Sequence, residues 1–540
     1  MNRLYYGDNL EVLRKEIKDE SVDLIYLDPP FNSQATYNVL FKAPTGEQSH
    51  AQIEAFEDTW HWGESAERAF DEVMSSGNTA ASELLRALRT SLHENDMMAY
   101  LAMMAIRLLE LHRVLKATGS LYLHCDPTAS HYLKMLLDGI FNVSNYRNEI
   151  IWKRRVGMSS AVHESNRFGI CTDTILFYAK SDSAQFRPQY NLDDPDYQRY
   201  IEERFTMVDE KGEQFQPTSL VNPAFRPNLI YEYKGYKPPP NGWMITKEKM
   251  TQWDKEGKIY FPKHPGRRLR RKSYAKELKG MPIQNLWTDI PEINSQAQER
   301  LGYPTQKPIA LLARIIEASS DPGDVVLDPF CGCGTAIHAA QKLKRQWIGI
   351  DVTHLAISLV EKRLKDAFPG ITYEVHGTPK DLDGARDLAA RDKYQFQWWA
   401  VSLVNAVPFG GKKKGADTGI DGLIYFKDFR DGKITTEKAV VSVKGGENVS
   451  VSMIRDLAHV VDREKAKMGL FITLAEPTDP MGKEALKEGY FETSTGGKYL
   501  KLQISTIKEL LAGKRPDLPS PDPGQFAKAE VEAKEQGKLL

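Results

Sequence analysis

The stretch Val22-Asp23-Leu24-Ile25-Tyr26-Leu27-Asp28-Pro29-Pro30-Phe31 decides how this chain folds. Its first six residues form an apolar run with a single acid, which predicts a strand buried on both faces. The two prolines cannot continue a hydrogen-bonded ladder, so the chain must leave the sheet after Asp28. An acid, two prolines and an aromatic residue are therefore presented at the carboxyl end of a strand, where open α/β sheets place their ligands.

Strand and helix patterns alternate on both sides of this stretch, which predicts an α/β fold with a mostly parallel, Rossmann-like sheet. We expect a first part of this core over residues 1–148 and a second part over 296–376. Segment 32–77 shows little period and is predicted to be a long functional loop. Helices are expected at 80–92, 97–115, 130–139 and 308–319, and further strands at 119–126, 325–328 and 346–351.

A glycine loop follows the predicted strand at 325–328. It reads Asp328-Pro329-Phe330-Cys331-Gly332-Cys333-Gly334-Thr335 and leads into a predicted helix, and the next strand ends in Asp351. This is the strand, glycine loop, helix, strand and acid order of a nucleotide site. The loop lacks the Lys-Ser/Thr pair of a phosphate-binding loop and the third glycine of the dinucleotide fingerprint. A nucleoside cofactor without a pyrophosphate is therefore favoured over ATP.

The region 149–295 is polar, aromatic and irregular, and it separates the two predicted parts of the core. A basic run is usually a solvated surface. Here the basic residues are interleaved with Tyr, Trp and Phe, a combination that suits phosphate contacts and base stacking. The net charge of the chain is −1, so binding to nucleic acid must come from local patches. The candidate DNA-binding residues are Lys153, Arg154, Arg267, Arg268, Arg270 and Arg271.

The composition bounds the number of domains and the compartment. With 540 residues, more than one domain is expected. Only four cysteines occur, which favours a reducing, cytoplasmic compartment. No apolar run approaches the roughly 20 residues of a membrane helix, so no membrane contact is expected. One residue separates Cys331 from Cys333, and no metal site is predicted there.

Three motifs, taken in chain order, resemble those of a known family. They are Asp28-Pro29-Pro30-Phe31, Gly302-Tyr303-Pro304-Thr305-Gln306-Lys307-Pro308, and the glycine loop 328–335. Residues 1–370 resemble the β group, circularly permuted, of DNA amino-methyltransferases that use S-adenosylmethionine. The resemblance implies double-stranded DNA as a partner, a homodimer of the kind that related enzymes often form, and region 149–295 as the target-recognition insert.

The same resemblance implies roles for individual residues. The cofactor would be held by Asp328, Phe330, Gly332, Gly334 and Thr335, with Asp351 on its ribose, Asp8 near its adenine ring, and Gln306 and Lys307 at its methionine end. The catalytic corner would be Asp28, Pro29, Pro30 and Phe31.

The chemistry of an exocyclic amine explains the catalytic corner. Its lone pair is delocalised into the base, so the amine is a poor nucleophile. Asp28 and the Pro29 carbonyl would accept its two hydrogens, and Phe31 would stack on the flipped base. No Pro-Cys pair occurs, which argues against methylation at ring carbon 5. An acid at the first motif position favours adenine N6, with cytosine N4 as the alternative.

Residues 377–515 predict a second α/β domain, and the Pro-, Lys- and Glu-rich tail 516–540 is expected to be disordered. Two segments of that domain, 419–422 around Asp421 and 441–446 with Ser442 and Lys444, resemble the Mrr-like branch of the restriction-endonuclease-like fold. That family uses an acid, and a Gln or Glu two residues before a Lys, to bind magnesium. Ser442 departs from this pattern, which weakens a magnesium site at Asp421.

Three functions stay open at this point. The first is an adenine-N6 DNA methyltransferase with a DNA-binding or nuclease-derived accessory domain. The second is a fused restriction–modification enzyme that also cuts DNA. The third is a non-catalytic DNA-binding protein that keeps the cofactor fold.

Overall fold

The computed structural model describes most of the chain and divides it into two compact units. The described residues are 2–30, 36–42, 48–57, 61–154, 168–264, 266–294, 297–301, 303, 305–409, 419–430, 433–519 and 532. The first unit joins Met1–Phe186 to Asn285–Leu540, and the second is Arg187–Gln284. Phe31, the loop 411–418 and nearly all of the tail 520–540 lie outside the described residues.

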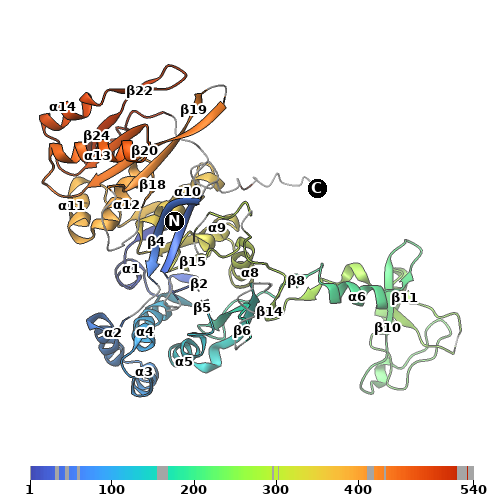
Figure 1. Ribbon diagram of the computed structural model, residues 1–540. Coiled ribbons are helices and arrows are strands. Elements are labelled where there is room, and N and C mark those ends of the chain that lie inside the picture. Colours follow the sequence, from blue (N-terminus) through green and yellow to red (C-terminus); the bar gives the residue numbers. More distant parts are fainter. Residues whose placement is uncertain are drawn as a thin grey trace. The chain divides into compact units, whose positions relative to one another are not determined.

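A nine-stranded sheet with the order β14-β6-β7-β5-β2-β15-β16-β1-β17 forms the core of the first unit (Figure 1). Only β7 runs antiparallel to its neighbours, so the prediction of a mostly parallel α/β sheet is confirmed. The strands are β1 (Arg3–Tyr6), β2 (Val22–Leu27), β5 (Leu115–Cys125), β6 (Tyr146–Lys153), β7 (Thr172–Ala179), β14 (Leu286–Trp287), β15 (Val325–Asp328), β16 (Gln346–Asp351) and β17 (Glu374–His376).

The pairing of β2 with β15 determines where the site forms. Leu24 lies opposite Val326 and Ile25 opposite Leu327, although some three hundred residues separate them in the chain. Both strands end at the same edge, because they run parallel. The catalytic corner after β2 and the glycine loop after β15 are therefore neighbours, as the open-sheet rule requires.

Helices cover the sheet and bury apolar faces against it. In α4 the buried residues include Met98, Leu101, Ala105 and Leu108, at helical spacing. Helices α2 to α5 cluster together in Figure 1. The helices around the core sheet are α1 (Asn9–Glu16), α2 (Glu64–Ser75), α3 (Thr79–Leu92), α4 (Asp96–Val114), α5 (Ser130–Phe141), α8 (Ile309–Ser319), α9 (Thr335–Lys342) and α10 (His354–Ala367).

The segment 32–77 is not the long loop that we expected. It contains an antiparallel hairpin of β3 (Thr36–Lys42) and β4 (Gln48–Glu57), followed by helix α2. The helix buries Ala66, Ala69, Phe70 and Val73, a spacing of three and four residues that its many charged neighbours disguise in the sequence.

The inserted region is narrower than the predicted range 149–295. Strands β6, β7 and β14 fall inside that range but pair within the core sheet, and only Arg187–Gln284 forms a unit of its own. The apolar stretch Thr174–Ala179 is buried, which is why it joins the core. Strands β6 and β7 were assigned to the insert because the basic residues Lys153 and Arg154 gave this segment the same composition as the insert.

The second unit is a small mixed domain. Its sheet has the order β11-β12-β10-β9 and packs over a cluster that includes Leu220, Trp243, Met250, Ile259 and Leu269. Its elements are β8 (Tyr190–Asn191), α6 (Pro195–Arg204), β9 (Met207–Val208), β10 (Gln214–Ser219), α7 (Lys247–Lys255), β11 (Ile259–Tyr260), β12 (Arg270–Tyr274) and β13 (Met281–Pro282).

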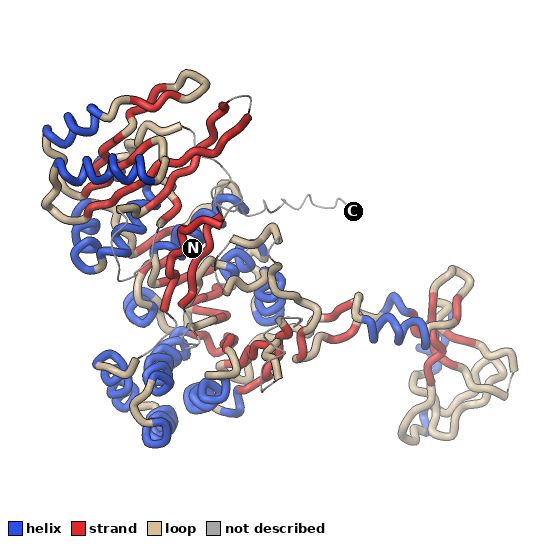
Figure 2. Tube along the Cα trace, viewed as in Figure 1, coloured by secondary structure: helices blue, strands red, loops and turns tan. Residues whose placement is uncertain are grey.

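The C-terminal part of the first unit carries a five-stranded sheet with the order β18-β19-β20-β21-β24 (Figure 2). Strands β19 and β20 are antiparallel, whereas β20, β21 and β24 are parallel. The elements are α11 (Leu382–Arg391), α12 (Lys393–Leu403), β18 (Val407–Pro408), β19 (Gly422–Arg430), β20 (Lys433–Lys444), α13 (Val451–Arg463), β21 (Met468–Thr473), α14 (Asp479–Lys487), β22 (Tyr490–Glu492), β23 (Lys498–Leu500), β24 (Leu502–Thr506) and α15 (Ile507–Leu511).

No helix in the described part of the chain has the length and apolar character needed to cross a membrane.

Candidate active site

The end of β2 presents Asp28 to a cavity of about 350 Å³. Asp28 Oδ2 lies 2.5 Å from Lys307 Nζ, and only 17% of the Asp28 side chain is exposed. Asp28 Oδ1 is buried and accepts no hydrogen bond from any described residue. The corner therefore holds one oxygen of the carboxylate in an ion pair and leaves the other available to a ligand. Phe31, the predicted stacking residue, lies outside the described part.

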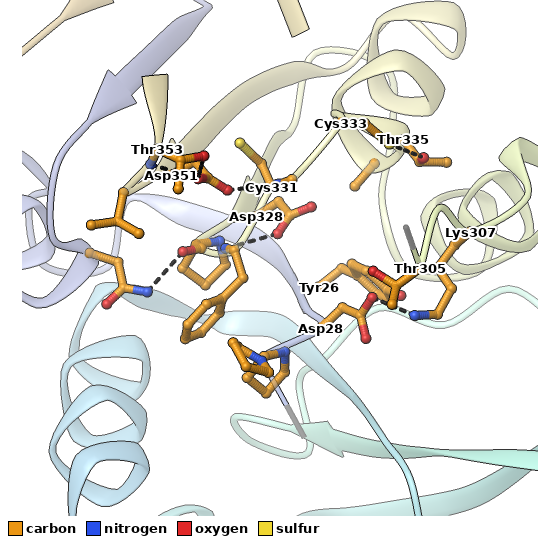
Figure 3. Close-up of a pocket in the computed structure, with 18 of the residues that line it drawn as sticks. Tyr26, Asp28, Thr305, Lys307, Asp328, Cys331, Cys333, Thr335, Asp351 and Thr353 are labelled. Atoms are coloured by element: carbon orange, nitrogen blue, oxygen red, sulfur yellow. Dashed lines mark hydrogen bonds and ion pairs between the residues drawn. The ribbon is translucent and has the colours of Figure 1, made fainter. Parts of the chain in front are cut away.

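The cavity brings together most of the predicted site residues (Figure 3). Its volume falls in the range of small-molecule sites. Among the predicted residues, Gly334 does not line it. The predicted residues that line the cavity are Asp8, Asp28, Pro29, Pro30, Gln306, Lys307, Asp328, Phe330, Gly332, Thr335 and Asp351.

The glycine loop requires glycine at two positions. Gly332 has φ +48°, and a Cβ there would lie 3.2 Å from a ring carbon of Tyr303. Gly334 has φ +75°, and its Cβ would lie 2.8 Å from Val360 Cγ2. Both conformations are left-handed and disfavour a side chain. Gly332 thus keeps the wall of the cavity open, whereas Gly334 lets the loop pack closely against α10.

A buried carboxyl group, Asp328, and a half-buried one, Asp351, lie at the ends of β15 and β16. Asp351 Oδ2 accepts from the Gly332 amide, and its Oδ1 accepts from the amide and hydroxyl of Thr353. Burial nevertheless raises the pKa of Asp351 to about 6. Among the described residues, Asp328 accepts a hydrogen bond from the Phe330 amide, and burial, with Asp28 and Asp351 nearby, raises its pKa well above the usual range. With a pKa of about 6, Asp351 is ionised near pH 7.

A buried arginine that the sequence analysis missed lies between Asp8 and the glycine loop. Arg107 donates to Asp8 Oδ2 at 2.9 Å and to Asn9 Oδ1 at 2.6 Å. Asn9 Nδ2 in turn donates to the Pro329 carbonyl. Asp8 also caps α1 by accepting from the amides of Leu10 and Glu11. In the sequence, the presence of the charged Arg107 within the apolar run of α4 could have indicated a buried polar network.

Gln306 and Lys307 point their polar groups in different directions. The Gln306 side chain accepts from the Leu301 amide and donates to the Glu299 carbonyl, so it ties its own loop together. Lys307 reaches the catalytic corner, and its exposure is only 8%. The resemblance implied that both residues serve the cofactor's methionine end, and this role stays a prediction.

A second buried network lies behind the catalytic corner. The Tyr26 hydroxyl contacts His124 Nδ1 at 2.9 Å, and His124 Nε2 contacts Asp173 Oδ2 at 3.1 Å. Arg154 Nε lies 3.1 Å from Asp173 Oδ1. Burial alone would raise the pKa of Asp173, but His124, Lys307 and Arg154 lower it overall. Arg154, a predicted DNA-binding residue, is thus engaged with a buried carboxylate.

The other predicted DNA-binding residues differ in their solvent exposure and in their contacts with other side chains. Lys153 is exposed at the end of β6, and Arg267, Arg268 and Arg270 are exposed in the second unit. Arg271 forms an ion pair with Glu277 and lies 4.9 Å from the centre of the Trp253 ring. Their contact with DNA stays a prediction.

The predicted nuclease residues converge at neighbouring strands of the C-terminal sheet. Asp421 Oδ2 accepts from the Val443 amide at 2.7 Å, between Ser442 and Lys444, and Ser442 is buried. The described residues contain no group of three His, Cys, Asp or Glu side chains that could hold a metal ion. Magnesium at Asp421 stays a prediction.

The cavity suits a cationic nucleoside cofactor. Four carboxylates (Asp8, Asp28, Asp328 and Asp351) and two cationic side chains (Arg107 and Lys307) line it. The glycine loop and the acid at the end of β16 are those of a nucleoside site. S-Adenosylmethionine carries both a ribose and a sulfonium charge, so these residues fit it.

A Rossmann-like sheet with this cavity, and with an unpartnered acceptor at the end of a central strand, defines a transferase that binds a nucleoside cofactor. Residues 22–362 match the DNA methylase family, and the chain belongs to that family. Residues 388–490 match a restriction endonuclease family of the Mrr type.

Relatives agree with this assignment. The chain is 30% identical to the type II methyltransferase M.EcaI of Enterobacter cloacae, over 67% of this chain and 69% of that protein. It is 28% identical to the StyLTI Mod subunit of a type III restriction–modification enzyme from Salmonella typhimurium, over 64% of this chain but only 50% of that subunit. It is 25% identical to the DNA adenine methyltransferase YhdJ of Escherichia coli, over 67% and 82% of the two chains.

Proposed function

We propose that this protein transfers a methyl group from S-adenosylmethionine to the exocyclic N6 of an adenine that is flipped out of double-stranded DNA. The observation that carries the proposal is the buried, unpartnered Oδ1 of Asp28, which faces the same cavity as the glycine loop. A buried acceptor without a donor costs free energy, and an amine of the target base would satisfy it.

The cofactor would be held between the glycine loop and the end of β16. Asp351, ionised near pH 7, would accept from the ribose hydroxyls, and Gly332 would let the backbone approach closely. When bound, S-adenosylmethionine supplies a methyl group on a sulfonium centre, which an amine nitrogen can attack.

The catalytic corner prepares the amine. Asp28 Oδ1 and the Pro29 carbonyl would accept its two hydrogens, which withdraws the nitrogen lone pair from the ring and favours a tetrahedral nitrogen. Both acceptors are held at the end of β2, so positioning and electrostatics supply the acceleration. Phe31 would provide the stacking surface for the flipped base.

Adenine is favoured over cytosine for two reasons. Asp28 is the acid that favours N6 transfer, and the relative YhdJ is described as an adenine methyltransferase. We also propose a cytoplasmic location, from the few cysteines, and a homodimer, from the family resemblance. Cleavage of DNA by the C-terminal domain is not favoured, because Ser442 offers no charge to a metal ion.

The test is methylation of duplex DNA by the purified protein, followed by mass spectrometry of the nucleosides. N6-Methyl-2′-deoxyadenosine should appear. Asp28→Asn should lower kcat by about 100-fold or more, the cost typical of losing one such electrostatic contact. Calorimetry should give the same cofactor Kd for this variant and the wild type. Product in the form of N4-methylcytosine would select the alternative, and full activity of Asp28→Asn would refute the mechanism.

A further inference from the structure

An ion pair between Lys307 and Asp28 links the motif 302–308 to the catalytic corner. Lys307 Nζ lies 2.5 Å from Asp28 Oδ2, and the two side chains are 9% and 17% exposed. Surface ion pairs contribute little, but a pair this buried is not screened by water. Its geometry therefore fixes which oxygen of Asp28 faces the cavity.

The backbone around Lys307 is held firmly. Thr305 has φ +62°, a left-handed conformation that is costly for a β-branched residue. Gln306 binds the backbone of residues 299 and 301, and the Ile309 amide donates to Glu299 Oε2 at the start of α8. Strain of this kind persists only where the surroundings enforce it. The ammonium of Lys307 thus reaches the corner from a segment whose backbone is tied at residues 299, 301 and 309.

Asp28 is surrounded by other acidic groups, and Lys307 is the cation paired with it. Asp328 on β15, Tyr26 on β2, Tyr303 on the loop before α8 and Cys125 on β5 all interact electrostatically with Asp28. Within the described residues, Asp328 forms no ion pair, and burial raises its pKa well above the usual range. Asp28, in contrast, has the Lys307 ammonium 2.5 Å from its Oδ2.

We propose that Lys307 is a positioning residue for Asp28 and does not serve the methionine end of the cofactor. Its ammonium holds Oδ2 and directs Oδ1 toward the target amine. This inference rests on the proposed function, because it assigns Asp28 to the amine. It replaces the role that the family resemblance implied for Lys307.

The test compares Lys307→Met, which removes the charge but keeps the length, with Lys307→Arg, which keeps the charge. With saturating cofactor, Lys307→Met should lower kcat by about 100-fold. Lys307→Arg should recover most of that loss, because it keeps a cation beside Asp28. The cofactor Kd should stay within about threefold of wild type in both variants.

Gln306→Ala is the matched control, because it loosens the same loop but leaves the ammonium in place. It should lower kcat far less than Lys307→Met does. If Lys307→Met does not fold, Lys307→Gln, which is polar but uncharged, replaces it with the same expectations.

Two results would overturn the assignment. One is a rise of about tenfold in cofactor Kd with unchanged kcat at saturation, which would place Lys307 on the cofactor. The other is a loss of kcat in Lys307→Met that Lys307→Arg does not recover. A wild-type protein that binds cofactor but methylates no base would instead refute the proposed function itself.

Discussion

Individual carboxylates in the cavity differ because their partners differ. Asp351 accepts three hydrogen bonds from Gly332 and Thr353, whereas Asp328 accepts one from Phe330. Burial raises the pKa of both, that of Asp351 to about 6. Asp351 is thus the residue through which pH should act on the cofactor site.

The pKa of Asp351 predicts opposite effects of pH on folding and on cofactor binding. Its pKa is raised from 3.8 to about 6 in the folded protein. The folded state therefore binds this proton more tightly than the unfolded state. The resulting contribution to the free energy of unfolding is fully present below about pH 4 and is lost as pH rises through 6. An ionised Asp351 is needed to accept from ribose hydroxyls. The Kd for S-adenosylmethionine should hence rise below pH 6, by up to about tenfold per unit.

Calorimetry between pH 5 and pH 8 measures this dependence. Asp351→Asn should bind more weakly and lose the rise below pH 6, which separates Asp351 from any titration of the ligand. A pH dependence that is identical in Asp351→Asn would assign the effect to another group.

Among the structural elements, α4 does more than cover the sheet. Its Arg107 joins the start of α1, through Asp8 and Asn9, to the Pro329 carbonyl in the glycine loop. Burial lowers the pKa of Arg107, although Asp8 offsets part of this effect. The helix therefore holds two walls of the cofactor cavity at a fixed separation.

Removing this link should loosen the cavity. Arg107→Met leaves the Asn9 side chain buried without its partner, so the free energy of unfolding should fall by about 1–3 kcal/mol. The cofactor Kd should rise severalfold, because Asp8 and the Pro329 turn are no longer joined. Urea unfolding and calorimetry measure the two effects. Arg14→Met, which breaks the more exposed pairs with Glu72 and Glu110, should cost less than about 1 kcal/mol. Equal losses in both variants would contradict the role of Arg107.

The sequence predicts those elements whose defining residues lie close together in the chain, and it misses those that depend on distant contacts. Prolines, glycines and acids at fixed spacing predict the corner after β2, the glycine loop and the acid Asp351. The structure brings these three features together. Arg107 depends on partners 98 and 99 residues away, which no local pattern reveals. The hairpin β3–β4 and the core strands β6 and β7 were missed because polar and basic neighbours obscured short buried runs.

At the scale of the whole molecule, the C-terminal domain shares a core with the methyltransferase. Leu355 and Leu359 of α10 belong to one buried cluster with Trp398 and Leu423. The His354 ring stacks on Tyr6 at 3.6 Å, and the His354 amide donates to the Gln395 side chain. The chain reaches α10 directly after Asp351 and Thr353. The restriction-endonuclease-like domain therefore supports the helix that follows the cofactor site.

Deleting residues 378–540 should consequently impair the methyltransferase even though every predicted methyltransferase residue remains. The deletion exposes Leu355 and Leu359, so the fragment should aggregate or unfold at lower temperature and bind the cofactor more weakly. In the full chain, Trp398→Ala should reproduce part of this effect, with a loss of about 3–5 kcal/mol typical of a buried tryptophan. Leu486→Ala is the control, because Leu486 is exposed on α14 of the same domain. Thermal unfolding and light scattering follow stability and association. A monomeric 1–377 fragment with wild-type melting temperature and kcat would show that the two domains are independent, and that the shared core has no part in holding α10 beside Asp351.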